Sequence, residues 1–418
     1  YTATLVDGTT YQFNVKETDL AGNTSNATSN FAVTGDTTSP ILSETTSVPS
    51  LTNDNSTQYT FSSSEGGTIS IGGSCSSDNS TAVADNMTVS FADLEDGTYS
   101  NCSITVADSA GNTQIITVNS FTIDTIAPIL SQVTAITSPT NDNTSSYTFS
   151  STEAGSITYG GSCSSSTTTS TTDNNTVTFN ALSDGTYSNC KISVTDDASN
   201  ISDNLSVNSF TIDTVKPILA QVTAVTTPTN DTTPGYSFSS DEAGTISYGG
   251  SSCSPGGTSA IDGTNSISFG TLSEGSYSCT ITVTDSAENA SSALSANTFV
   301  IDTTAPTVSS ISSSTSDGAY KLDDNITVTV TFDENVIVDN SSGNPRIQLE
   351  TGTNDRYATY ISGNSTSILS FLYTVQSGDN SSDLGYKSSD SLFVNSGTIR
   401  DNATNDATLT LFSPNQSG

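Results

Sequence analysis

A five-residue phrase, Asp-Thr-x-x-Pro, returns four times along this chain of 418 residues. It begins at Asp36, Asp124, Asp213 and Asp302, so the intervals are 88, 89 and 89 residues. Within each interval the same landmarks follow in one order: TNDN or TNDT, a Glu shortly before a Gly, a Cys, L-x-x-G-T/S-Y, a second Cys and V-x-D-x-A-x-N. Such a fixed period marks a tandem array, and each unit must fold within roughly 89 residues.

The repeat predicts five segments. Residues 1–35 match only the back half of a unit, because LVDGTTYQFNVKETDLAGNTSN aligns with LEDGTYSNCSITVADSAGNTQ. Residues 36–123, 124–212 and 213–301 are complete units, whereas 302–418 lacks Cys and carries longer strand-like runs such as ITVTVTF and SILSFLYTV. We therefore expect a piece of a longer array that ends in a divergent module.

Short alternating runs within each unit favour strands. MTVSF at 87–91, SITYG at 156–160 and TITV at 280–283 alternate apolar and polar residues between turn signals. A unit of this size with such runs fits a seven-stranded sandwich better than a solenoid. The fold class predicted is all-β, with tandem immunoglobulin-like (Ig-like) Greek-key β-sandwich domains in a linear array.

A tyrosine precedes the second cysteine strand of every complete unit. Tyr99, Tyr187 and Tyr277 follow the turn L-x-x-G-T/S, and Tyr11 is related to them in the partial unit. The position is typical of the tyrosine corner of Greek-key sandwiches. An ordinary core tyrosine in a hairpin is the alternative interpretation.

The six cysteines fall two to each complete unit. If TISIGG and YSNCSITV are adjacent antiparallel strands, the end of the first lies beside the start of the second, within bonding reach. We therefore expect three structural disulfides: Cys75 with Cys102, Cys163 with Cys190, and Cys253 with Cys279. Two Cys per unit without His are too few for a zinc site, and a catalytic thiol would lack an activating base. Disulfides indicate an oxidising, extracellular compartment.

Composition excludes most catalytic chemistry. The chain has 43 Asp and Glu against 8 Lys and Arg, a formal charge of −35, and neither His nor Trp. Without His, the common triads, dyads and imidazole metal sites cannot form. An Asp/Glu pair of glycosidase type would have to stand apart from the repeat pattern, and none does. We expect a protein that is not an enzyme and does not bind nucleic acid, since so negative a chain repels it.

The acidic residues that recur are the candidate metal ligands. They occupy loops that we expect at the domain junctions, where their mutual repulsion calls for a cation. Calcium suits such loops, because it takes six to eight oxygen ligands. The candidates are Asp19, Asp108, Asp196 and Asp285 of the V-x-D-x-A-x-N turn; Asp36, Asp124, Asp213 and Asp302 of the link; Asp54, Asp142 and Asp231 of TNDN/TNDT; and Glu65, Glu153 and Glu242.

One alternative to this calcium hypothesis remains open for the repeats, and two interpretations remain open for the acids of the divergent module. Asp and Asn are common turn formers, so the repeated acids are also consistent with solvated loops. In the divergent module, Asp333, Glu334, Asp379, Asp383 and Asp401 offer an ion site or are simply solvated loop acids.

Several phrases carry a family resemblance over residues 1 to about 305. ETDLAGNTS at 17–25, TNDTTP at 229–234 and IDTTAPT at 301–307 resemble the bacterial Ig-like repeats of giant surface adhesins. The resemblance implies an extracellular stalk, often rigidified by calcium at domain junctions. The Cys pairs depart from the commonest form, and VTDDASN and VTDSAEN replace the usual AGN turn, so ligand sets are expected to differ between junctions.

Two functions follow from these observations. The first is a non-catalytic stalk segment of a large adhesin at the cell surface, whose partners are further Ig-like domains of the same longer chain. The alternative is a subunit of a self-assembling surface filament or S-layer-like structure, with lateral self-association. No apolar run of 18 residues occurs, so we expect no membrane insertion within this segment.

Overall fold

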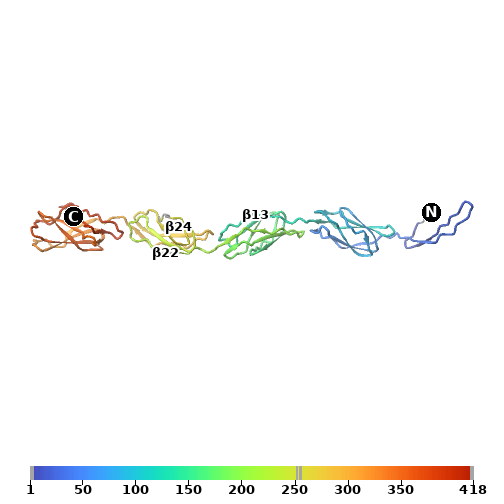
Figure 1. The fold of residues 1–418 in the computed structure, drawn as a ribbon, viewed down its shortest axis with the longest axis horizontal. Helices are drawn as coiled ribbons and strands as arrows, with labels where there is room; N and C mark the ends of the chain where they lie inside the picture. The colour runs from blue at the N-terminus through green and yellow to red at the C-terminus, as the bar shows by residue number, and fades with distance from the viewer. Residues whose placement is uncertain (1–3, 251–252, 254–256, 415–418) are drawn as a thin grey trace. The chain divides into compact units, whose positions relative to one another are not determined.

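The structure, a computed structural model, describes residues 4–250, 253 and 257–414. The regular structure of these residues consists of β-strands and includes no helix (Figure 1). The chain forms an all-β, tandem Ig-like fold that separates into two compact units: residues 1–138 with 142–212, and residues 139–141 with 213–418.

The first unit begins with a hairpin of the partial repeat, β1 (Thr10–Phe13) paired with β2 (Phe31–Thr34). The repeat 36–123 follows in three sheets, ordered β3-β5-β8, β11-β10-β6-β7 and β4-β12-β9. Its strands are β3 (Leu42–Thr46), β4 (Leu51–Thr52), β5 (Gln58–Ser63), β6 (Gly67–Gly72), β7 (Thr81–Ala82), β8 (Asp85–Ser90), β9 (Gly97–Tyr99), β10 (Ser103–Ala107), β11 (Thr113–Thr117) and β12 (Phe121–Ile123).

The repeat 124–212 has the same plan, with sheets β13-β14-β17, β16-β15-β19-β20 and β18-β21. Its strands are β13 (Leu130–Thr134), labelled in Figure 1, β14 (Ser146–Ser151), β15 (Gly155–Gly160), β16 (Thr169–Ser170), β17 (Asp173–Thr178), β18 (Gly185–Tyr187), β19 (Lys191–Thr195), β20 (Leu205–Ser206) and β21 (Phe210–Ile212).

Strand alternation explains each sandwich core. In β5, Tyr59, Phe61 and Ser63 point inward while their neighbours are less buried. Tyr59 and Phe61 pack with Ile104 and Val106 of β10, a strand of the other sheet, in one apolar cluster. Because inward residues of both sheets meet, burial of their side chains stabilises the two-layer arrangement.

In the second unit, the repeat 213–301 forms sheets β22-β23-β26, β25-β24-β28-β29 and β27-β30. The strands are β22 (Leu219–Thr223), β23 (Gly235–Ser240), β24 (Gly244–Gly250), β25 (Ser259–Ala260), β26 (Gly263–Ser268), β27 (Gly275–Tyr277), β28 (Cys279–Thr284), β29 (Leu294–Ser295) and β30 (Phe299–Ile301).

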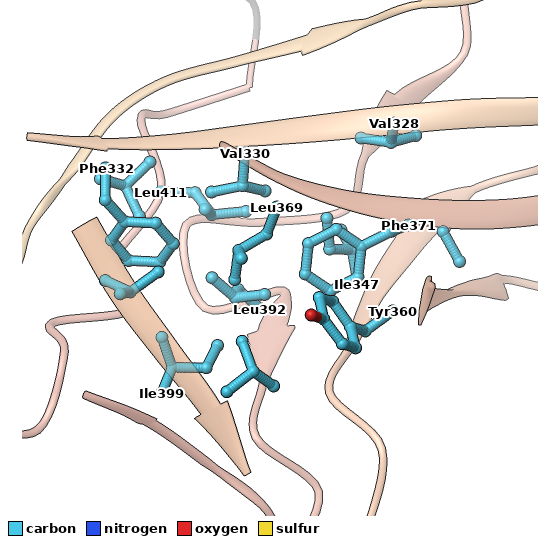
Figure 2. Close-up of a cluster of buried hydrophobic side chains, with 14 of the residues drawn as sticks. Val328, Val330, Phe332, Ile347, Tyr360, Leu369, Phe371, Leu392, Ile399 and Leu411 are labelled. Carbon is cyan, nitrogen blue, oxygen red and sulfur yellow. The ribbon is translucent and has the colours of Figure 1, made fainter. Parts of the chain in front are cut away.

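The module 302–418 has fewer and longer strands. They are β31 (Val308–Ser313), β32 (Asn325–Asp339), β33 (Arg346–Glu350), β34 (Arg356–Ser362), β35 (Thr366–Thr374), β36 (Gly385–Tyr386), β37 (Leu392–Phe393) and β38 (Thr398–Arg400). Figure 2 shows its core, in which Val330, Ile347, Leu369 and Phe371 are fully buried.

The structure contains a disulfide in each complete repeat, between Cys75 and Cys102, Cys163 and Cys190, and Cys253 and Cys279, with Cα–Cα distances of 5.4, 5.3 and 5.8 Å. In the first, β6 pairs antiparallel with β10, and Gly72 lies opposite Ser103. The chain then turns at Gly73, which has φ +80° and no room for a Cβ beside the Asn101 carbonyl. The turn therefore needs glycine, and it delivers Cys75 to Cys102.

The tyrosine-corner prediction is confirmed by hydrogen bonds. The Tyr99 hydroxyl donates to the Glu95 carbonyl at 3.0 Å, and those of Tyr187 and Tyr277 donate to carbonyls four residues upstream at 2.9 and 2.8 Å. Each tyrosine thus closes the turn that precedes it.

Candidate metal centres

Three carboxylates meet at the start of each complete repeat and of the module 302–418. One comes from Asp-Thr-x-x-Pro, one is a Glu, and one comes from a tight turn further along the chain. In every group, one oxygen from each residue lies within 4.8 Å of the others. The groups are Asp36, Glu65 and Asp108; Asp124, Glu153 and Asp196; Asp213, Glu242 and Asp285; and Asp302, Glu334 and Asp401. We call them the junction clusters.

Sheet pairing places the Glu beside the turn Asp. Glu65 lies between β5 and β6, and Asp108 follows β10. Because β6 and β10 pair with Thr68 opposite Ala107, these two acids come to the same end of one sheet. Asp36 joins them from the segment between β2 and β3.

An asparagine ties the turn Asp to the link. Asp108 accepts the backbone N–H groups of Ala110 and Asn112 at 2.8 and 2.9 Å, and its other oxygen accepts the Asn112 side-chain amide at 2.8 Å. The same amide also donates to the Asp36 carbonyl at 3.2 Å. The equivalent bonds are made by Asn200 to Asp196 and Asp124, Asn289 to Asp285 and Asp213, and Asn405 to Asp401 and Asp302.

The Glu of each cluster and the turn Asp108 differ in the direction in which their pKa is shifted. Burial, and then repulsion from Asp108 and Asp36, raise the pKa of Glu65. Burial is also the main cause that raises the pKa values of Glu153, Glu242 and Glu334. Repulsion from the other acids of each cluster raises them further. Burial opposes ionisation of Asp108 too, but the hydrogen bonds from Asn112 and the turn amides outweigh it and lower its pKa.

The donor set fits a hard divalent cation. Two oxygens bound to one calcium ion are separated by no more than about 5 Å, twice the Ca–O distance, and the cluster oxygens meet this limit. Among the described residues, the recorded ion pairs join Arg356 to Asp379, Lys387 to Asp355 and Arg400 to Asp406, so none of them neutralises a cluster acid. Carboxylate oxygens with no basic partner are the chemistry that calcium prefers over soft metals.

Four sequence candidates lie outside the junction clusters found among the described residues. Asp54 accepts the Ser56 backbone N–H and hydroxyl, both at 2.9 Å, and so caps its own loop. Asp142 and Asp231 make the same local bonds to Thr144 and Thr233. Asp19 has the turn geometry of Asp108, with bonds from Ala21 and Asn23.

Several functional candidates are missed by a sequence reading that follows the repeated Asp and Glu alone. Asn112, Asn200 and Asn289 are the last residue of V-x-D-x-A-x-N, and Asn405 ends the related phrase I-R-D-N-A-T-N. The acid directly before the Gly of the tyrosine turn is another: Asp7 accepts the Thr37 amide at 2.7 Å and the Thr38 hydroxyl at 3.0 Å. Asp96 accepts both donors of Thr125, and Glu274 accepts the hydroxyls of Thr303 and Thr304. These bonds hold the Asp-Thr-x-x-Pro segment against the preceding repeat.

In the module 302–418, two of the five acids named in the sequence lie in a junction cluster. Glu334 and Asp401 join Asp302 in a junction cluster, and Asp401 is only 2% exposed. Asp333 instead accepts the backbone N–H and hydroxyl of Thr307, and Asp379 pairs with Arg356. The phrase DNATN at 401–405 keeps the Asp and Asn spacing of the repeats.

No described helix has the length and apolar character needed to cross a membrane. A family model described as bacterial Ig-like domain (group 3) matches residues 264–364, which include the last strands of one repeat and the first half of the module that follows. A search of curated proteins finds no match.

Solved structures of low similarity also align with the chain. Fibronectin(III)-like modules of Clostridium thermocellum CbhA align at 11% identity and TM-score 0.26, over 41% of this chain and 94% of theirs. A Salmonella alpha-2-macroglobulin reacted with methylamine aligns at 8% identity and TM-score 0.15, over 88% of this chain and 33% of its own. The extracellular region of plexin A4 aligns at 11% identity and TM-score 0.17, over 85% and 37%. The chain thus spans about a third of the length of the last two proteins.

Proposed function

We propose that this chain is a non-catalytic, extracellular stalk segment of a large surface adhesin, in which calcium at the junction clusters fixes each domain to the link that precedes it. One observation carries the proposal: the same three-carboxylate cluster recurs at the start of four successive domains, including one without cysteines.

The position of the link Asp gives calcium a mechanical role. Asp124 follows β12, the last strand of its repeat, and its backbone N–H donates to the Thr52 carbonyl at 3.0 Å. Its carboxylate belongs to the cluster with Glu153 and Asp196 of the next repeat. An ion held there binds the end of one repeat to the body of the next, and it removes the repulsion that would otherwise separate them.

The extracellular location rests on the disulfides. Three disulfides in a chain with no free cysteine among its described residues are typical of oxidising compartments. Further Ig-like domains of the same chain are the partners that this role requires.

Small-angle scattering of the whole chain, with 1 equivalent of calcium per cluster and then with excess chelator, tests the proposal. We expect the radius of gyration to change on chelation, because unneutralised clusters loosen the links. Glu153→Gln should reduce calcium stoichiometry by one site in calorimetry. Asp142→Asn, in the same repeat but outside the cluster, is the matched control. Identical scattering in both conditions, together with no calorimetric heat, would exclude the calcium-fixed stalk.

Lateral self-association is a second candidate, and a repeated apolar position favours it. Ile41, Ile129 and Ile218 occupy the same place in three repeats and are 72%, 67% and 68% exposed. A single exposed isoleucine is ordinary, but one at the same place in three repeats offers a second copy of the chain the same apolar contact three times. Sedimentation of the chain over a range of concentrations tests this. Assembly that Ile129→Ser weakens supports a filament, whereas a monomer at every concentration rejects it.

A further inference from the structure

A cleft of about 680 Å³ opens in the module 302–418, away from the residues of the junction cluster. One wall is the segment 311–320, which includes the end of β31, and the other is the segment 379–386. The floor is apolar and continuous with the core of the module; its side chains include Ile326, Val328, Leu349 and Val375. The volume falls within the range of small-ligand pockets, roughly 300–1,000 Å³.

Three tyrosines line this cleft, and each has its hydroxyl bonded to the protein. The Tyr386 hydroxyl donates to the Phe412 carbonyl at 2.9 Å, that of Tyr320 donates to the Ser316 carbonyl, and that of Tyr373 donates to the Asp379 carboxylate. Because both the ring and its hydroxyl are held, the orientation of each ring is fixed before a ligand arrives. The rings of Tyr320, which is exposed, and Tyr386, which is half-buried, are available for contact with carbon atoms of a ligand, whereas Tyr373 belongs to the core.

The charged side chains that line the cleft are all carboxylates. Asp379 is held by the Arg356 guanidinium at 3.0 Å and by the Gln376 amide at 2.8 Å. Burial opposes its ionisation, but the bonds from Tyr373, Gln376 and Arg356 outweigh it and lower its pKa. Asp317 and Asp383 line the same cleft and are exposed. A ligand there needs hydroxyl or ammonium donors, and an anion is repelled by these carboxylates and by the charge of −35 on the chain.

We propose that this cleft binds a neutral saccharide, whose hydroxyls donate to Asp317 and Asp383 while its C–H faces pack on Tyr320 and Tyr386. A sugar ring combines donors on its edge with apolar faces, which matches a cleft that has carboxylates at the rim and fixed aromatic rings on its walls. A cationic peptide would satisfy the carboxylates but offers less to the rings and the apolar floor. The inference goes beyond a stalk, since it gives the last module a ligand of its own.

The test is an array of neutral, sialylated and sulfated oligosaccharides probed with the whole chain, with calorimetry on the best neutral binder. We expect binding to neutral glycans only. Tyr320→Ala should weaken it about tenfold or more, because the wall that packs on the sugar is removed. Asp383→Asn should weaken it less, since an amide oxygen still accepts one hydrogen bond.

Tyr357→Ala is the matched control, because Tyr357 is 39% exposed, Tyr320 is 38% exposed, and Tyr357 does not line the cleft. Tyr320→Phe, which keeps the ring, should retain most of the affinity and separates ring contact from loss of folding. Glu334→Gln changes the junction cluster and should leave glycan binding unchanged. The glycan proposal and the calcium proposal can therefore fail independently of each other. The proposal is overturned if no neutral glycan binds, if only sulfated glycans or oligolysine bind, or if Tyr357→Ala weakens binding as much as Tyr320→Ala.

Discussion

The repeat 124–212 and the module 302–418 build their sandwiches in different ways. The repeat uses short strands, such as the six-residue β14 and β15, with a disulfide inside its core. The module has no cysteine, but β32 runs for 15 residues and β35 for nine. Both nevertheless carry a three-carboxylate junction cluster tied by an asparagine to the link. The two domains thus differ in the construction of their cores but share the carboxylate cluster at their start.

The disulfide compensates for the limited stability of a core built from short strands. Small sandwiches bury a limited fraction of their surface, and a cross-link stabilises them by restricting the unfolded chain. The module replaces that restriction with longer strand pairing and a larger apolar cluster. Four predictions test this contrast, from the largest expected effect to the smallest.

Removal of a buried aromatic side chain from the module should have the largest effect on stability among the four predictions. Phe371 is fully buried, and Phe371→Ala leaves a cavity in the core of the module, so we expect a loss of about 3–5 kcal/mol in the free energy of unfolding. Denaturant unfolding followed by hydrogen exchange of residues 325–339 measures it. Phe393→Ala is the control, since Phe393 is 37% exposed. Equal losses in both variants would contradict a core role for Phe371.

Removal of the disulfide should affect the repeat alone. Cys163→Ala combined with Cys190→Ala opens a loop of 27 residues. On the chain-entropy model this lowers the free energy of unfolding of the repeat by about 3 kcal/mol. Hydrogen exchange should rise in β14 and β19 and stay unchanged in β32 and β35. Equal destabilisation of the module would show that the two do not unfold independently.

Loss of the bridging asparagine should affect both regions alike. Asn200→Ala and Asn405→Ala remove the amide that orients the turn Asp and holds the link carbonyl. Because such supporting groups position metal ligands, we expect calcium affinity at that cluster to fall roughly tenfold. Calorimetry of the whole chain measures it, with the exposed Asn174→Ala as control. A loss in only one of the two variants would mean that the clusters differ in kind.

The smallest expected effect is a difference in pH dependence between the module and the repeat. The Thr307 hydroxyl and amide both donate to Asp333 and lower its pKa from the ordinary value of 3.8. The stabilisation is therefore present above pH 3.8 and is lost as the pH falls through the lowered pKa. At the matching place in the repeat, a neutral hydroxyl, that of Thr152, accepts the Ile129 amide at 2.9 Å.

Hydrogen exchange, corrected for the intrinsic rate at each pH, should show increasing relative exposure of the Thr307 amide below pH 3.8 and no such trend for Ile129. Asp333→Asn should abolish the trend. Parallel behaviour of the two amides in the unmodified chain would show that the carboxylate is not responsible.

Much of the fold follows from local pattern. The Asp-Thr-x-x-Pro period and the alternating runs predict strands and an Ig-like array, because alternation reports which face of a strand is buried. The tyrosine corner was also predictable, since Tyr99 reaches a carbonyl only four residues upstream. Such features depend on neighbours in sequence, and sequence displays them directly.

The candidate site was less accessible from sequence. Asp54 and Asp108 both recur near Asn in loops, yet only Asp108 lies in a junction cluster of the described residues. The difference depends on which end of the sandwich each loop occupies, which the pairing of β6 with β10 decides. Glu334 was harder still, because it lies inside β32 rather than in a turn that resembles Glu65.

By itself, the sequence determined the repeating unit, the all-β class, the partners available to each cysteine and the acidity of the repeated loops. Only the tertiary structure decided which acids share a site and where the last module leaves its core open to a cleft. The physical reason is distance: the Asp36 and Asp108 side chains are 72 residues apart in the chain, and only strand pairing brings their oxygens within 4.8 Å of each other.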